Sequence, residues 1–411
     1  MERLKPSIEN PKRQDQSSTS FGVVSSEPEG RNISAVSLVR CQDYESSNVE
    51  AAIEKALGLI GGIGSYVKPG DHVLLKINLL TGDVPEKAVT THPAVVRAMI
   101  HQVKAAGGIP QVGDCSGYEG ASNPRRYFTA CRSSGIMQVC EDEKVEILHL
   151  SAQSVEAKNA GGRIFKSFIL SKHVLQADVL ISLPKLKTHG LTLFTGGVKN
   201  IFGCVTGLNK AKMHLRAQDP ETFSQMLVDL LGLVQPDLTV MDAVVGMEGN
   251  GPSNGKARQI NAILASKDPV ALDAVACKMV GIDPFMVPST RLAHEQGLGV
   301  GDLSRINVAG ENTGDMEIKD FQLPTGTASF FRARGLMRIL RSMLVAKPEL
   351  VKERCKKCWI CMEHCPCGAV SKKGEYPSFD HKKCIRCYCC QELCPGDAIE
   401  LRTPFLGRFV K

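Results

Sequence analysis

Two patterns of apolar and polar positions recur along the middle of the chain. Continuous or alternating apolar runs of strand length lie at 34–40, 72–80, 109–114, 179–189, 238–246 and 259–266. Apolar residues three and four positions apart predict helices over 48–60, 93–108 and 268–281. Asp268 and Pro269 stand at the start of the last segment, as an N-cap and a first helical residue.

This alternation of strands and helices predicts an α/β fold, with a doubly wound, mainly parallel sheet over residues 34–310. Ligands of such sheets bind beyond the carboxyl ends of the strands, so polar residues at those ends are the first candidates for a site.

The pattern is different at both ends of this domain. Residues 1–33 are polar and Ser-rich without periodicity, which predicts disorder. The connector 311–350 contains apolar positions from Phe330 to Leu344 at helical spacing, with arginines on another face. This basic amphipathic helix is expected to pack between domains, although such a face also permits peripheral contact with a membrane or docking of a redox partner.

Cysteine is concentrated near the C-terminus. Ten of the 16 cysteines lie between 355 and 394, in two runs 29 residues apart that begin CKKCWICMEHCP and CIRCYCCQELCP. Both have the spacing C-x2-C-x2-C-x3-C-P, in which three cysteines hold one 4Fe-4S cluster and the fourth crosses to the other cluster. The segment 351–405 therefore resembles the small α+β two-cluster domain of bacterial ferredoxins.

This spacing assigns two ligand sets, one for each of two 4Fe-4S clusters. The first set is Cys355, Cys358, Cys361 and Cys394, and the second is Cys384, Cys387, Cys390 and Cys365. Structural zinc would need paired ligands, and disulfides do not suit a reducing compartment. Cys367 and Cys389 are left over, and the six remaining cysteines are expected to be ordinary buried side chains.

The positive net charge of +7 is concentrated in the C-terminal region. Residues 329–411 hold 17 Lys and Arg against 8 Asp and Glu, whereas residues 1–328 hold 33 against 35. This excess compensates anionic clusters, and without a basic stripe or an aromatic platform it does not predict nucleic-acid binding. The sequence has no apolar run long enough for a membrane span and no apolar signal segment, which predicts a cytoplasmic protein.

Polar residues gather at the predicted strand ends and in glycine-rich loops. Lysines beside glycine turns suit an anionic ligand, and histidine transfers protons near neutral pH. The candidates for substrate binding are Lys76, Asn78, Asp114, Lys185, Lys187, Lys199 and Asn200, and those for proton supply are His92, His189 and Glu248. We expect them to line one pocket.

Known nucleotide and hydrolase motifs are missing from the sequence. No dinucleotide fingerprint, P-loop or nucleophile elbow occurs. Instead, LLKINLL, THPAVVRAMI, VGDCSG, LPKLKTHGLTLFTGGVKNIFG, MDAVVGMEGNGPSNG and ILASKDPVALDAVA occur in this order. Together they resemble domain-of-unknown-function family 362, described as uncharacterised iron-sulfur centre proteins. The resemblance implies no particular reaction.

The leading hypothesis is an iron-sulfur oxidoreductase that takes electrons from a redox partner protein and delivers them to an anionic substrate in the α/β domain. One alternative is an electron carrier whose large domain docks a partner enzyme. Another is a non-redox anion- or metal-binding domain of isomerase type.

Overall fold

The computed structural model describes residues 33–116, 124–207, 209–324, 345–402 and 404. The segment predicted to be disordered and the amphipathic helix of the connector lie almost entirely outside these residues. In the described ranges, no helix has both the length and the apolar content needed to cross a bilayer.

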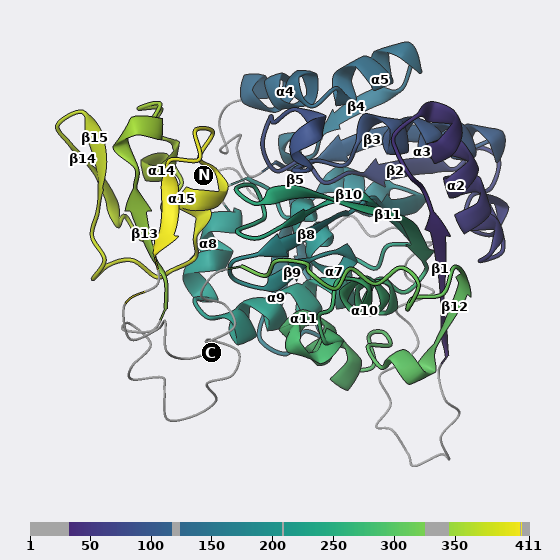
Figure 1. Cartoon of the computed structure of the whole chain (residues 1–411). Helices are drawn as coiled ribbons and strands as arrows, with labels where there is room; N and C mark the ends of the chain where they lie inside the picture. Colours follow the sequence, from purple (N-terminus) through teal and green to yellow (C-terminus); the bar gives the residue numbers. More distant parts are fainter. Residues whose placement is uncertain (1–32, 117–123, 208, 325–344, 403, 405–411) are drawn as a thin grey trace.

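A ten-stranded sheet forms the centre of the large domain (Figure 1). Its main path runs β12-β1-β11-β10-β7-β2-β3-β4, and β8 and β9 continue from β10 outside this path. The strands are β1 (Ser34–Arg40), β2 (His72–Lys76), β3 (Ile109–Asp114), β4 (Glu146–His149), β7 (Val179–Ser182), β8 (Lys185–His189), β9 (Leu193–Thr195), β10 (Leu238–Glu248), β11 (Lys256–Ser266) and β12 (Ile306–Gly310). Most neighbours are parallel, which confirms the predicted α/β class with a mainly parallel sheet.

Two strands differ from the expected series. β11 is antiparallel to both β1 and β10. Only residues 249–255 connect β10 to β11, and a parallel crossover needs about a dozen residues or more, so a hairpin results. The run predicted as one strand over 179–189 is divided into β7 and β8 at Pro184, which has no N–H for a ladder.

Helices cover both faces of the sheet (Figure 1). One face packs against α2 (Ser46–Gly58), α3 (Pro93–Ala105), α4 (Pro124–Ser133) and α5 (Ile136–Asp142). The opposite face packs against α9 (Pro220–Leu233), α10 (Pro269–Met279) and α11 (Pro288–Glu295). The side chain of Asp268 accepts hydrogen bonds from the backbone N–H groups of Val270 and Ala271, which confirms the predicted N-cap of α10.

Smaller elements lie along the chain between the main strands and helices. They are α6 (Lys172–Gln176), α7 (Gly197–Asn200), the 3-10 turn η4 (Ile201–Cys204), α8 (Asn209–Arg216) and the hairpin of β5 (Ser154–Lys158) and β6 (Ser167–Ser171).

Residues 345–402 form a separate compact part, which we call the cysteine-rich module. Figure 1 shows it beside α8 at one edge of the large domain. It contains the pair β13 (Lys347–Leu350) and β16 (Ile399–Arg402), the pair β14 (Val370–Lys373) and β15 (Tyr376–Phe379), and the short helices α14 (Ile360–Glu363) and α15 (Cys389–Glu392).

The 29-residue repeat of the sequence is also a repeat of the backbone. α14 and α15 begin 29 residues apart, and both follow a residue with positive φ, Trp359 at 63° and Tyr388 at 63°. Lys357 and Arg386 repeat the same left-handed backbone two residues earlier. The two cysteine runs therefore have matching local structures.

Candidate functional site

Three polar residues meet where parallel strands end. Lys76 ends β2, Asp114 ends β3 and Ser182 ends β7, and in the sheet Lys76 stands opposite Ser182 on one side and Gly113 on the other. Parallel strands present their carboxyl ends at one edge, so residues far apart in the sequence become neighbours there.

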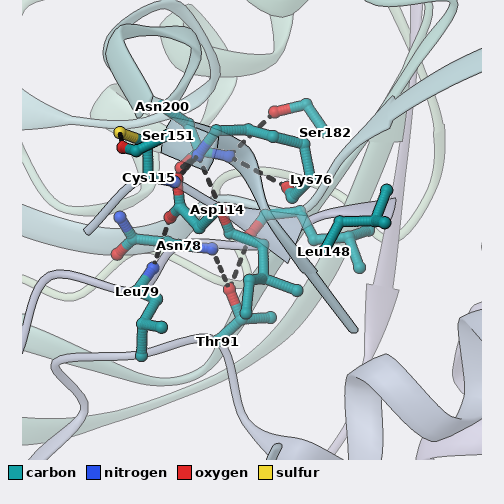
Figure 2. A network of polar contacts seen from close by, with 12 residues as sticks. Lys76, Asn78, Leu79, Thr91, Asp114, Cys115, Leu148, Ser151, Ser182 and Asn200 are labelled. Carbon is teal, nitrogen blue, oxygen red and sulfur yellow. Dashed lines mark hydrogen bonds and ion pairs between the residues drawn. The ribbon is translucent and has the colours of Figure 1, made fainter. Parts of the chain in front are cut away.

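Lys76 and Asp114 form a buried ion pair, with 2.8 Å between Nζ and Oδ1 (Figure 2). The same ammonium donates to the carbonyl of Ile77 at 2.7 Å and to Oδ1 of Asn200 at 3.3 Å. Backbone N–H groups of Leu79 and Cys115 donate to the Asp114 carboxylate, each at 2.7 Å. The charges are thus paired and hydrogen-bonded, as burial requires.

A cavity of about 350 Å³ opens beside this network. Its wall combines strand ends, α8 and the cysteine-rich module. The predicted substrate-binding residues that line it are Lys76, Asn78, Asp114, Lys199 and Asn200, and the module contributes Glu363, His364, Cys365, Pro366, Cys389, Glu392 and Leu393. A predicted cluster ligand, Cys365, therefore borders the same cavity as the strand-end lysine.

Lys185 belongs to a different buried cluster. Its Nζ lies 2.8 Å from Oδ2 of Asp242 and donates to the hydroxyl of Tyr44 at 2.6 Å. The ring of His92 stacks on Tyr44 with centroids 3.5 Å apart, and burial lowers the pKa of this histidine to about 4. Neither Lys185 nor His92 is among the cavity-lining residues, and the contacts of both are internal to the fold.

Lys187 and His189 are buried on β8. Nζ of Lys187 donates to the carbonyl of Val89 at 2.7 Å, and burial, followed by the charges of Lys199 and Lys185, lowers its pKa well below the usual value. Nδ1 of His189 accepts from the N–H groups of residues 191 and 192, which leaves its proton on Nε2. This Nε2 lies 3.2 Å from Oε1 of Glu392, near enough for an ion pair if protonated but not aligned as a hydrogen bond.

Glu248 and the glycine-rich loop after it form contacts outside the cavity. The Glu248 carboxylate accepts from the N–H of Gln322 at 3.2 Å. The loop meets the cysteine-rich module, because the carbonyl of Asn250 accepts from the amide side chain of Gln391 at 3.1 Å, and Ser253 donates to the carbonyl of Glu392 at 2.7 Å. This loop holds the module against the large domain.

Sequence reasoning missed several residues that line the cavity. Lys210, Lys212 and His214 come from α8, and Thr195 comes from β9. His214 stacks on Phe223 with centroids 4.6 Å apart, and burial lowers its pKa to about 3. The mixture of lysines and apolar residues in 209–216 was visible, but nothing local showed which surface this helix would cover.

Lys199 also faces this cavity. Burial lowers the pKa of its ammonium, while the nearby carboxylate of Glu392 acts in the opposite direction. In the described part of the chain this ammonium has no hydrogen bond or ion pair within contact distance.

The first predicted ligand set surrounds a second, much smaller cavity of about 20 Å³. Cys355, Cys358, Cys361 and Cys394 all line it, although Cys394 comes from the other run. Burial raises the pKa of the Cys361 thiol to about 12, and the charges of the other three act in the same direction.

The second set is grouped in the same way. Burial raises the pKa of the Cys390 thiol, and Cys387, Cys384 and Cys365 are among the neighbours that raise it further. The fourth cysteine of each run accepts a backbone N–H from four residues later, from Ala369 to Cys365 Sγ at 3.2 Å and from Ala398 to Cys394 Sγ at 3.3 Å.

These donors are compatible with iron-sulfur binding, since thiolates are the ligands that iron-sulfur clusters take and N–H groups directed at sulfur stabilise them. Among the described residues no three His, Cys, Asp or Glu side chains are placed to hold a single metal ion. A four-iron cluster instead takes its four thiolates on separate irons.

The other cysteines have distinct surroundings. Cys367 Sγ lies 3.8 Å from Cys365 Sγ, and Cys389 is buried in the wall of the larger cavity. Outside the module, Cys41, Cys115, Cys131, Cys140, Cys204 and Cys277 are all buried, as predicted.

Comparison with known proteins finds a family model, "Domain of unknown function (DUF362)", that matches residues 73–278. A thylakoid-associated protein of Synechocystis sp. is 34% identical over 312 residues, which cover 75% of this chain and 93% of that protein. Among solved structures, the lactate racemase apoprotein from Thermoanaerobacterium thermosaccharolyticum shows a TM-score of 0.38 at 12% identity, over 59% of this chain and 56% of that chain. The family model and the Synechocystis relative confirm the predicted family resemblance, with the family model matching residues 73–278.

Proposed function

The chain belongs to the DUF362 family, which is defined by a domain of unknown function, and we propose that this member is an iron-sulfur oxidoreductase acting on an anionic substrate. The substrate binds in the 350 Å³ cavity, and a soluble partner protein supplies the electrons. The observation that supports this proposal most directly is that Cys365, a ligand in the second predicted set, lines this cavity together with Lys76, Asp114 and Lys199.

The two cysteine sets would hold the clusters. Bound 4Fe-4S clusters supply one-electron transfer, so two equivalents are needed for a two-electron reduction. The first set includes the exposed Cys358, whereas the second includes the buried Cys387 and Cys390 together with Cys365 at the cavity. This gradient of exposure suits a donor that approaches the first set and a substrate that lies beside the second.

The residues of the large domain have separate tasks in this proposal. Lys199 binds the anionic group, because its ammonium faces the cavity and is not committed to a carboxylate. Lys76 and Asp114 neutralise each other and form a fixed polar wall. His92, His189 and Glu248 are not among the cavity-lining residues, so their predicted role in proton supply stays untested.

The cluster assignment is tested with two serine variants from the same run. Anaerobically purified wild-type protein should contain about eight iron and eight sulfide per chain. Cys365→Ser should lose about half of both, because it removes one of the four thiolates of the second set. Cys367→Ser is the matched control and should keep them. Stoichiometric zinc without iron, or equal iron loss in both variants, would contradict the assignment.

The reaction is tested separately with reduced methyl viologen as donor and a panel of oxo and unsaturated organic acids as acceptors. Acceptor-dependent viologen oxidation is expected from wild type and should fall at least tenfold in Lys199→Gln with an unchanged cluster spectrum. If no acceptor is reduced while the clusters are intact, the electron-carrier alternative is favoured.

A further inference from the structure

Several buried polar atoms around the 350 Å³ cavity have no partner within the described chain. They are Oδ1 of Asn78, Oγ of Ser116, Oγ1 of Thr195, Nδ1 of His214, Nε2 of His364 and Oε1 of Glu392. Oε1 of Glu392 lies 3.2 Å from Nε2 of His189 without hydrogen-bond alignment. Ser116, Thr195 and His214 expose 4%, 4% and 7% of their surface. Buried polar groups are normally hydrogen-bonded, and six such groups around one cavity indicate that a polar ligand completes several of them.

The cavity wall also carries a surplus of positive charge. Asp114 is paired with Lys76 at 2.8 Å, and Glu363 is paired with Arg126 at 3.1 Å. Glu392 is the remaining acid of the wall. Against it stand two further lysines of the wall, namely Lys199 and Lys212. Lys210 also lines the wall, and its ammonium donates to the carbonyl of Cys115.

The rest of the wall is apolar. Leu79, Phe202 and Leu393 are buried there, and Leu215 of α8 lies at the exposed side with 42% of its surface accessible. A large leucine exposed beside a cavity gains contact when an apolar group enters. Small-molecule sites commonly combine such an apolar lining with a few placed polar groups, and a volume near 350 Å³ suits a small organic molecule.

We propose that the cavity binds an amphipathic organic anion, with its anionic group at Lys199, its apolar body against Phe202 and Leu215, and its oxygen substituents at Ser116 and Thr195. Lys199 is the anchor because its ammonium has no bonded partner among the described residues, whereas Lys212 is exposed at the rim. The inference names the substrate class of the proposed function and rests on it only for the statement that the ligand is reduced.

Binding can be tested with two aromatic probes that differ by one charge. 8-Anilinonaphthalene-1-sulfonate carries a sulfonate on the same ring system as the uncharged N-phenyl-1-naphthylamine. Isothermal titration calorimetry of the anaerobic, cluster-containing protein should show at least tenfold tighter binding of the sulfonate, as expected from one charge-assisted hydrogen bond. In Lys199→Gln this preference should fall to about threefold or less.

Two further variants complete the test. Lys256→Gln removes an exposed lysine of β11 outside the cavity lining and should leave the preference unchanged. Leu215→Glu adds a carboxylate at the rim, at an already exposed position, and should weaken sulfonate binding even if Lys199→Gln does not fold. Equal binding of the two probes to wild type, or an unchanged preference in both cavity variants, would overturn the inference.

The result of the binding test can be distinguished from the result of the activity test of the proposed function. Sulfonate-selective binding without acceptor reduction would support the ligand class while rejecting the oxidoreductase. Acceptor reduction without sulfonate selectivity would do the reverse.

Discussion

Three buried lysines on the strand ends are compensated in three different ways. Lys76 has a carboxylate and two oxygen acceptors, and Lys185 has a carboxylate and a phenol. Among the described residues, Lys187 has only the carbonyl of Val89 at hydrogen-bond distance. Since a buried ammonium is costly without a partner, the first two are structural ion pairs. For Lys187, burial lowers the pKa well below its usual value, in line with its weak compensation.

The structural role of Lys185 can be measured. Lys185→Met should lower the free energy of unfolding by about 3–5 kcal/mol, because it leaves Asp242 buried without its partner. The double variant Lys185→Met/Asp242→Leu should recover at least half of this loss, since it removes both buried charges. Urea unfolding under anaerobic conditions provides the measurement. A single-variant loss below about 1 kcal/mol would instead leave Lys185 free to serve a ligand.

At the scale of elements, the 3-10 turn η4 closes over the strand-end network. A Cβ on Gly203 would lie 2.3 Å from Oδ1 of Asp114 and 2.3 Å from Nζ of Lys76. Both are atoms of a buried ion pair that cannot withdraw into solvent. The glycine is required here by close approach, because the turn passes directly over the pair.

Gly203→Ala should therefore destabilise the protein by about 1–3 kcal/mol through overpacking and weaken probe binding in the adjacent cavity. Gly232→Ala is the control, since its Cβ would meet only Leu298 at an ordinary 3.7 Å inside α9. Replacing a helical glycine there should raise stability by up to about 1 kcal/mol. Thermal unfolding of both variants would decide, and equal stability of the two would contradict the packing argument.

At the scale of the whole molecule, the large domain and the cysteine-rich module are stabilised in different ways. The large domain has three extensive groups of buried apolar side chains. The core within the cysteine-rich module is a small group made of Cys361, Val370, Cys390 and Ile399, with Cys365 and Cys394 beside it. A core in which cysteines are so prominent is expected to depend on its metal for stability.

Removal of iron should therefore affect the module first. In apoprotein prepared by anaerobic chelation, amide hydrogen exchange should become faster throughout 345–402, while the strands of the large domain keep their protection. Mass spectrometry of peptic fragments can compare the holo and apo forms. Retained protection of the module after complete iron loss would show that it folds without clusters.

Local sequence patterns were sufficient to predict much of the fold. The bounds of β1 and β3, the N-cap at Asp268 and the 29-residue repeat follow from spacing and from nearby residues alone. The prediction of a mainly parallel sheet did not specify the direction of β11. The predicted strands 238–246 and 259–266 left a connection of about a dozen residues, whereas in the structure β10 and β11 extend further and leave only 249–255, too short for a parallel crossover.

The residues of the candidate site also fall into a group that the sequence predicts and a group that only the structure reveals. The sequence by itself determined the ten clustered cysteines with their two equivalent runs, and the placement of Lys76 and Asp114 at strand ends, because these depend on spacing within a few residues. Only the tertiary structure decided that Lys185 pairs with Asp242, that Lys199 lines the cavity, and that α8 and Cys365 complete its wall. Such contacts join positions far apart in the chain, and burial and partners are properties of the packed molecule, which no local pattern encodes.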